Sequence, residues 1–440
     1  MKPKHAFPTT AFLLSQEDIP HQWFNIVPEL PKPIDPYISC VTGEVVTADE
    51  LAPLLPGELL RQEFTDESWV DIPDEVYEAY KLWRPTPLRR AVRLERALDT
   101  PAHIYFKHEG TSPAGSHKPN TAIPQVFYAK QDGAKRVVTE TGAGQWGSGV
   151  AMAACLLGLE SKIYMVNVSY NQKPYRRVFI ECFGGQVVPS PSPDTAIGRE
   201  YLKQDPDNPG NLGIAVAEAV EDAKGRDDTK YVLGSALSYV LMHQTVIGQE
   251  AKRQMEMAGE YPDVVIGCVG GGSNWGGLAL PFVSDKMARG LGTRVVMVEP
   301  TAAPSMTQGK FDYDYAEPSK TIPMMRMYSL GVDYQPASIH AGGLRLSCVA
   351  PICSVLLESG VVEARAVAQM PVFEAARIFL QAEAIVPAPE SAHAILAVID
   401  EALECRKTGE AKTILFNLSG HGLFDLGAYD KFNSGQLENA

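Results

Sequence analysis

The sequence predicts an α/β protein of two lobes, each a mostly parallel twisted sheet with helices on both faces, preceded by a proline-rich N-terminal arm. Three observations lead to this class. From about residue 84 onward, short β-rich runs alternate with amphipathic helical runs, which is typical of parallel sheets. A chain of 440 residues is too long for one ordinary core. Four prolines between residues 28 and 36 exclude a long helix in the first segment.

We divide the chain into an arm (residues 1–80), an N-terminal lobe (81–242) and a C-terminal lobe (243–440). The arm should pack over the body, with short helices at 48–55 and 74–82, where apolar residues recur at helical spacing. Predicted strands cover residues 102–107, 136–140, 162–168, 186–189, 230–233, 263–269, 294–298 and 413–417. Predicted helices cover residues 175–183, 213–224, 244–258, 364–383 and 391–406.

Composition restricts the partners. The net charge is -14 and no basic run is present, which argues against nucleic acid, because phosphate backbones require a basic face. No apolar run reaches membrane-spanning length, and the run 11–14 is too short for a signal peptide. The seven cysteines are scattered without a C-x-x-C pair, so we expect reduced thiols and no metal site. These features predict a cytoplasmic protein with a small ligand.

Ligands of parallel sheets bind at the carboxyl ends of strands, so we expect the site residues in the loops that follow strands. The first such loop, residues 140–147, contains Gly142, Gly144 and Gly147 and opens a helix, which favours an anion. The same spacing fits the dinucleotide fingerprint. However, the next strand supplies no acid for a ribose, and Glu140 would repel a pyrophosphate more than a small carboxylate. We therefore favour a carboxylate over NAD.

The second loop forms a predicted phosphate cup. It consists of Gly270, Gly271, Gly272, Ser273 and Asn274 at a helix start, and no lysine follows the glycines, which excludes a nucleoside-triphosphate loop. A third loop places Ser419 after the last strand, and Lys118 precedes a helix. A lysine, a monophosphate cup and a hydroxyl are what pyridoxal phosphate requires for its aldehyde, phosphate and ring nitrogen. An amino-acid substrate would then present its carboxylate to the first loop.

Five motifs carry a resemblance to a known family. They are Trp-Arg-Pro-Thr-Pro-Leu at 83–88 and the segments at 112–120, 139–147, 243–248 and 340–345. With these motifs the chain resembles the tryptophan synthase β-subunit family, in its longer second form, through most of its length. The resemblance implies the type II pyridoxal-phosphate fold and a lyase that joins L-serine and indole into L-tryptophan and water.

The resemblance also implies roles for individual residues. Lys118 is the expected Schiff-base lysine, Glu140 the acid/base for serine's hydroxyl and for indole, and Asp333 closes over the amino acid. The cofactor is expected to be held by Lys118, His117, Asn120, Gly270, Gly271, Gly272, Ser273, Asn274, Glu390 and Ser419. The substrate is expected to contact Thr141, Gly142, Ala143, Gly144, Gln145, Trp146 and Arg345. We expect Arg345 to reach the β-substituent, which would admit O-phosphoserine as a donor. Residues from about 133 to 220 are expected to form a mobile substrate region.

The chain departs from the main form of the family in two places. Trp146 replaces a histidine, and the long arm is absent from that form, so we expect α-subunit docking to be transient at most. The resemblance implies a homodimer and is compatible with a monovalent cation. A serine or threonine deaminase and a sulfide-using synthase are alternatives that share Lys118, and a non-catalytic binder is a third. A carboxylate at Glu140 favours indole over sulfide, because indole has an N–H to polarise.

Overall fold

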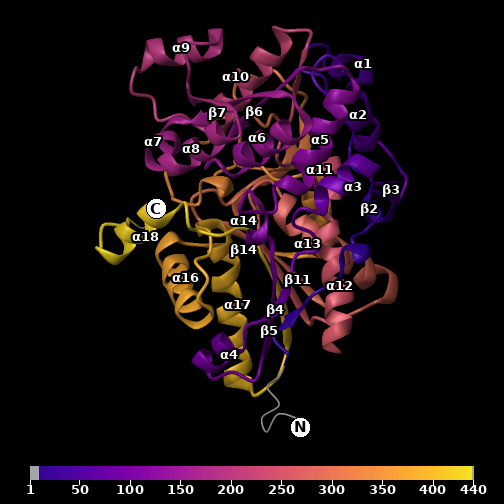
Figure 1. Ribbon diagram of the computed structural model, residues 1–440, viewed down its shortest axis with the longest axis vertical. Coiled ribbons are helices and arrows are strands. Elements are labelled where there is room, and N and C mark those ends of the chain that lie inside the picture. The colour runs from indigo at the N-terminus through magenta and orange to yellow at the C-terminus, as the bar shows by residue number, and fades with distance from the viewer. Residues whose placement is uncertain (1–8, 439–440) are drawn as a thin grey trace.

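Two sheets of parallel character organise the computed structural model, which describes residues 9–438 (Figure 1). The larger has seven strands in the order β1-β4-β5-β15-β10-β11-β14, and the smaller has four in the order β8-β7-β6-β9. All pairs in the smaller sheet are parallel, and in the larger sheet only β1 with β4 and β4 with β5 are antiparallel. The predicted α/β class with mostly parallel sheets is confirmed.

The strands are β1 Ala11–Phe12, β2 Gln22–Phe24, β3 Trp69–Asp71, β4 Leu88–Arg90, β5 His103–His108, β6 Arg136–Thr141, β7 Glu160–Val166, β8 Gln186–Ser190, β9 Thr229–Tyr231, β10 Val264–Cys268, β11 Arg294–Pro300, β12 Lys310–Asp314, β13 Met325–Ser329, β14 Glu363–Val367 and β15 Thr413–Leu418. Two antiparallel pairs, β2 with β3 and β12 with β13, stand apart from the main sheets.

The α-helices are α1 Ala48–Leu51, α2 Gly57–Glu63, α3 Asp74–Tyr80, α4 Val92–Leu98, α5 Pro119–Gln131, α6 Gln145–Leu157, α7 Asn167–Gln172, α8 Pro174–Cys182, α9 Ala196–Gln204, α10 Leu212–Lys224, α11 Ser238–Gln244, α12 Val246–Ala258, α13 Ser273–Arg289, α14 Ser305–Gln308, α15 Pro351–Glu358, α16 Gln369–Glu383, α17 Pro389–Thr408 and α18 Leu426–Asn433. Among residues 9–438, every helix falls short of the length and apolarity that crossing a bilayer demands.

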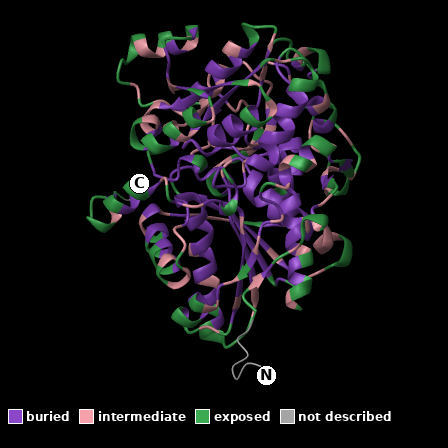
Figure 2. Ribbon diagram, viewed as in Figure 1, coloured by how far each residue is buried: buried purple, intermediate pink, exposed green. Residues whose placement is uncertain are grey.

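Helices cover both faces of the larger sheet because its central strands are apolar on both sides. Along β10, Val264 and Ile266 belong to the core that contains α16 and α17, whereas Val265 belongs to the core that contains α13. This alternation follows from the two-residue period of a strand. Figure 2 shows the result, with buried residues concentrated in the sheets and on the helices that flank them.

The register of the larger sheet brings three loops together. Phe106 of β5 pairs with Phe416 of β15, and Phe416 pairs with Ile266 of β10. Because these strands are parallel, their carboxyl ends lie at one edge, and the residues that follow them meet there. Those residues are the segment that leads to Lys118, the loop at Ser419 and the glycines at 270–272.

The sheets do not divide at residue 242. After β1, β4 and β5 of the larger sheet, the chain passes through α5 to build the smaller sheet, and it returns to the larger sheet at β10. The segment 81–242 therefore contributes strands to both sheets, because β5 pairs with β15 over six residues.

One predicted helix boundary differs from the structure by several residues because of tertiary contacts. The predicted helix at 364–383 is wrong at its start, since residues 363–367 form β14, which pairs in parallel with β11, and α16 begins only at Gln369. Pairing with β11 outweighs the helical spacing of this short run. Smaller differences occur at β7, which ends at Val166, and at α1, which ends at Leu51.

The arm packs into the main core. Trp23 is fully buried, and its ring lies 4.3 Å from that of His243 in α11. The main-chain N–H of Phe24 donates to Thr245 Oγ1 at 2.9 Å. Figure 1 places α2 and α3 next to α5 and α11. The first eight residues of the expected arm lie outside the described residues.

Candidate active site

A cavity of about 200 Å³ lies where the carboxyl ends of the two sheets approach each other. It is lined by residues that end or follow β6, β9, β10 and β15. Of the predicted site residues, it brings together His117, Lys118, Glu140, Thr141, Gly142, Ala143, Gln145, Trp146, Gly270, Gly271, Gly272, Ser273, Asn274, Glu390 and Ser419.

Lys118 directly precedes α5, with Pro119 at the first helical position, where a missing N–H costs nothing. Its Nζ donates to Gly234 O at 2.7 Å and to Ser273 Oγ at 3.2 Å. Burial lowers the pKa of Lys118 to about 8, although Glu140 attracts the charged form. The amine therefore loses its proton at a lower pH than an ordinary lysine, and only the unprotonated form can attack an aldehyde.

His117 lies beside the lysine and is neutral. Its Nε2 is 3.3 Å from Ser273 Oγ, and its main-chain N–H donates to Ser419 O at 2.9 Å. Burial and the neighbouring Lys118 lower the pKa of His117 to about 3. The imidazole can thus hydrogen-bond a phosphate without adding charge.

The phosphate cup (residues 270–274) depends on its glycines. Gly272 has a φ of +111°, which favours glycine, and it caps the 17-residue helix α13. A methyl group on Gly271 would lie 2.3 Å from Ser235 Oγ, so no side chain fits there. The side chain of Asn274 turns away from the cup, because Nδ2 donates to Cys268 O at 2.9 Å and Oδ1 accepts from Asn417 Nδ2 at 2.7 Å. Asn274 can contribute only its backbone N–H.

Ser235 is a site residue that the sequence reasoning missed. Its Oγ is buried, lines the cavity beside Gly271 and has no hydrogen-bond partner among the described residues. An unpaired buried hydroxyl is costly unless a ligand satisfies it. The only local signal is the Gly234-Ser235 pair after β9, followed by Ala236 in the left-handed region with a φ of 80°. Together with the free N–H groups at the start of α13, this hydroxyl fits a monophosphate.

The carboxylate loop (residues 141–145) connects β6 to α6. Gly144 has a φ of +96°, and Thr141 Oγ1 accepts the N–H of Gly147 at 3.2 Å. Gly144 is not among the residues that line the cavity. The side chain of Trp146 is fixed by two contacts, because its Nε1 donates to Thr139 Oγ1 at 2.6 Å and its ring packs on Gly234. The loop therefore directs the N-terminus of α6 toward the cavity, and these contacts hold it in place.

Glu140 is the penultimate residue of β6 and lies in the cavity wall. Tyr231 donates its hydroxyl to Glu140 Oε2 at 2.6 Å. Burial raises the pKa of Glu140, while Tyr231 and Lys118 oppose that rise. A carboxyl group whose pKa is raised can carry a proton to a leaving group and take one back.

These features match known proteins. Residues 80–420 match the family of pyridoxal-phosphate dependent enzymes. The chain is 54% identical over 429 residues to tryptophan synthase beta chain 2 of Aquifex aeolicus, covering 97% of this chain and 99% of that protein. It is 52% identical over 416 residues to tryptophan synthase beta chain 2 of Thermotoga maritima, covering 94% and 98%. The chain belongs to the tryptophan synthase β-chain family.

Solved structures support the fold of this family. Threonine deaminase isoform 2 from Solanum lycopersicum has a TM-score of 0.60 at 19% identity, covering 83% of this chain and 95% of that one. An L-serine ammonia-lyase from Rhizomucor miehei has a TM-score of 0.60 at 17% identity, covering 81% and 99%. At these identities the likeness concerns the fold alone. The solved structures, the family model and the full-length relatives together confirm three expectations. These are the two-lobe type II fold, the pyridoxal-phosphate cofactor and the lyase class.

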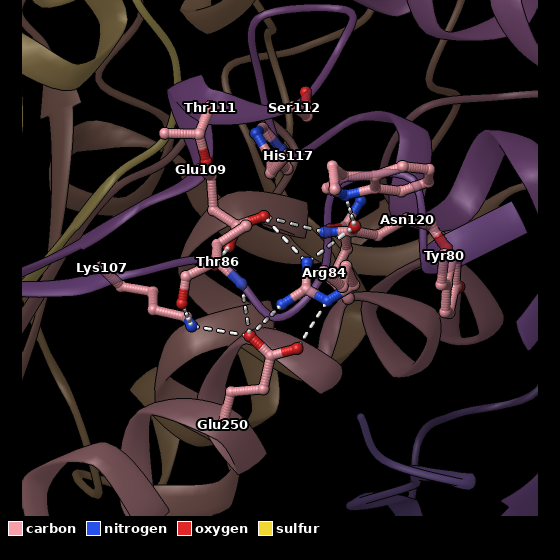
Figure 3. A network of polar contacts seen from close by, with 12 residues as sticks. Tyr80, Arg84, Thr86, Lys107, Glu109, Thr111, Ser112, His117, Asn120 and Glu250 are labelled. Atoms are coloured by element: carbon pink, nitrogen blue, oxygen red, sulfur yellow. Dashed lines mark hydrogen bonds and ion pairs between the residues drawn. The ribbon is translucent and has the colours of Figure 1, made fainter. Parts of the chain in front are cut away.

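Asn120 does not line the cavity, contrary to its expected contact with the cofactor. Its side chain points into a buried polar cluster (Figure 3). Oδ1 accepts from Arg84 NH1 at 2.9 Å, and Nδ2 donates to Glu109 Oε2 at 3.1 Å and to Gln244 Oε1 at 3.0 Å. Because both ends of the amide are occupied, Asn120 anchors α5 beneath Lys118 instead.

Asp333 and Arg345 also lie away from the cavity. Asp333 is exposed on the segment that follows β13. Arg345 donates to Ser169 Oγ at 3.0 Å and lines a smaller neighbouring pocket. Its NH2 lies 3.2 Å from where a methyl group on Gly342 would be, and Gly342 does line the cavity. Gly342 therefore separates Arg345 from the cavity.

The arm supplies part of the cavity wall, which the sequence reasoning did not anticipate. Its contribution is mostly apolar and consists of Tyr37, Leu51, Leu54, Leu55, Leu60 and Glu63. Glu63 accepts from the hydroxyl of Tyr37 and, at 3.1 Å, from the main-chain N–H of Tyr239. Burial raises the pKa of Glu63 to about 7. This part of the cavity is suited to an apolar molecule.

Proposed function

We propose that this protein catalyses the pyridoxal-phosphate-dependent β-replacement of L-serine with indole, giving L-tryptophan and water. The observation that carries the proposal is the convergence of Lys118, the phosphate cup, the carboxylate loop and Glu140 on one cavity. Identity above 50% to several tryptophan synthase beta chains, over nearly the whole chain, supports the same reaction.

The cofactor is held by residues of both sheets in this proposal. Lys118 binds its aldehyde, and Ser419 meets its ring nitrogen. The N–H groups at the start of α13, the hydroxyl of Ser235 and the neutral His117 hold its phosphate. When bound, pyridoxal phosphate supplies an electron sink for the carbon that carries the amino group.

Proton transfer is assigned to two residues. Lys118 Nζ takes the proton from the α-carbon of serine, which its lowered pKa of about 8 supports. Glu140 gives a proton to the departing β-hydroxyl and accepts the proton that indole loses. The carboxylate loop holds the serine carboxylate at the start of α6, so that the β-carbon faces Glu140.

Indole enters the part of the cavity that the arm lines. Leu51, Leu54 and Leu55 exclude water there and favour a neutral aromatic nucleophile. Sulfide would need no such apolar surface.

A coupled assay tests the reaction. Purified protein saturated with pyridoxal phosphate should convert serine and indole to tryptophan, detected by mass spectrometry. Glu140→Ala should abolish coupling while cofactor capture is retained, and Glu256→Ala, at an exposed helical position, serves as the control. Pyruvate as the sole product, in the presence of indole, would favour a deaminase. Coupling that survives in Glu140→Ala would refute the role of Glu140.

Two finer substrate features belong to the same proposal. Arg345 reaches the β-substituent and admits O-phosphoserine, which requires its guanidinium to pass Gly342, the residue that separates it from the cavity. An unchanged ratio of phosphoserine to serine turnover in Arg345→Ala would remove this role. Residues from about 133 to 220 move when the amino acid binds, and Asp333, on the segment after β13, closes over it. Hydrogen exchange in this region should slow on addition of serine.

The assembly is inferred from the family. The protein forms a homodimer in the cytoplasm, and an α-subunit docks transiently at most. Light scattering of the purified protein, alone and mixed with a tryptophan synthase α-subunit, measures both. A stable complex with the α-subunit would contradict transient docking.

A further inference from the structure

Ser419 meets two other polar side chains on the wall of the cavity. Its Oγ lies 2.7 Å from Ser391 Oγ and 3.8 Å from Cys268 Sγ. Ser391 is fully buried in the first turn of α17. The direction in which the Ser419 hydroxyl donates therefore depends on whether these two neighbours donate to it or accept from it.

The Ser391 hydroxyl has two acceptors in reach for its one proton. Its Oγ accepts the main-chain N–H of Gly420 at 3.1 Å, which occupies one lone pair. The remaining acceptors in reach are Ser419 Oγ at 2.7 Å and Gly420 O at 3.3 Å. A serine hydroxyl has one proton, and the shorter contact has the length of a good O–H···O bond.

Cys268 is the second side chain in reach of Ser419 Oγ. Asn417 donates to Asn274 Oδ1, which fixes the Asn274 amide so that its Nδ2 donates to Cys268 Sγ at 3.2 Å. The sulfur is thus an acceptor on that side, which leaves its S–H available to donate to Ser419 Oγ. Burial raises the pKa of Cys268 to about 12, so the thiol keeps its proton.

We propose that Ser391 is a positioning residue that fixes Ser419 as a hydrogen-bond donor toward the cavity. A hydroxyl oxygen has two lone pairs, and the protons from Ser391 and Cys268 occupy both. The proton of Ser419 is left to face the ligand, and the atom opposite must be an acceptor.

The consequence for the reaction rests on the proposed function, in which Ser419 meets the ring nitrogen. A donor at Ser419 requires that nitrogen to be unprotonated. An unprotonated ring withdraws electrons less strongly, which restrains side reactions at the α-carbon. Replacing Ser391 by alanine frees a lone pair on Ser419, which can then accept a hydrogen bond from a protonated ring nitrogen.

Nitrogen NMR of the holoenzyme, reconstituted with pyridoxal phosphate carrying ¹⁵N in the ring, tests the proposal across neutral pH. The wild type should stay at the shift of an unprotonated pyridine. Ser391→Ala should move toward the pyridinium shift as the pH falls. Ser354→Ala, which removes another fully buried helical serine hydroxyl outside the cavity, should behave as the wild type.

A double variant separates positioning from a general structural effect. If Ser391 acts through Ser419, the variant Ser391→Ala/Ser419→Ala should match Ser419→Ala alone. Where Ser391→Ala loses the cofactor, Ser391→Cys retains a weak donor and should give an intermediate shift. An unchanged shift in either Ser391 variant, or independent effects in the double variant, would overturn the proposal. A wild-type protein that binds no cofactor at Lys118 would instead refute the proposed function.

Discussion

The buried polar cluster around Arg84 should make this arginine one of the residues whose loss costs most stability (Figure 3). The Arg84 cluster consists of Arg84, Lys107, Glu109, Asn120 and Glu250, and all five are buried. Arg84 Nε donates to Glu250 Oε1 at 2.8 Å, and its NH1 donates to Glu109 Oε2 at 3.1 Å. Arg84→Met leaves two buried carboxylates with Lys107 as their one cation within the cluster.

The magnitude follows from removing one partner of a buried ion pair. Such a change costs about 3–5 kcal/mol, because the remaining charge loses its compensation while water stays excluded. This corresponds to roughly two to three and a half powers of ten in the folding equilibrium constant. Arg294 offers a matched control, since it also pairs with two carboxylates, Glu363 and Glu401, but its side chain is 41% exposed. Arg294→Met should cost about 1 kcal/mol or less.

Urea unfolding followed by tryptophan fluorescence measures both variants, with Trp83 as a probe close to Arg84, since its Nε1 lies 3.3 Å from Asn120 Oδ1. The pH dependence gives a second readout. Burial disfavours the charged form of Glu109, yet Arg84 and Lys107 lower its pKa to about 2. The wild type should therefore lose this contribution as the pH falls from about 4.3, the usual glutamate value, toward 2. Equal losses of stability in the two arginine variants would refute the reasoning.

Three further predictions concern the cavity. Capture of pyridoxal phosphate by the apoprotein should speed up as the pH rises through about 8, the lowered pKa of Lys118, and an absorbance change that begins only near the usual lysine value of about 10.4 would contradict burial as its cause. Stability should decrease as the pH rises from about 4.3 toward 7, because burial raises the pKa of Glu63 to about 7, and Glu63→Gln should flatten this part of the urea-midpoint profile. Leu55→Trp should lower kcat/KM for indole about 5- to 150-fold, given an overpacking cost of roughly 1–3 kcal/mol, and should leave cofactor capture unchanged. Unaltered indole kinetics in that variant would place the acceptor elsewhere.

Local patterns in the sequence were sufficient to find the chemical centre. Lys118, Glu140 and the glycines at 270–272 were predicted from loops that follow strands. The cavity contains them all, because parallel strands end at a common edge. The family was also recognisable from its motifs, and the comparisons confirm it.

Tertiary structure decided which of the remaining residues reach the cavity. Asn120 is two residues from Lys118 in sequence, yet its side chain turns into the Arg84 cluster, which joins segments more than 160 residues apart. Ser235 lines the cavity with no more local signal than the Gly234-Ser235 pair after β9, and Glu63 lines it although no local pattern marks it. Hydrophobic periodicity reports which face of an element is buried, but not which distant segment covers it. The contents of a site between two sheets are therefore fixed only when long-range packing is complete.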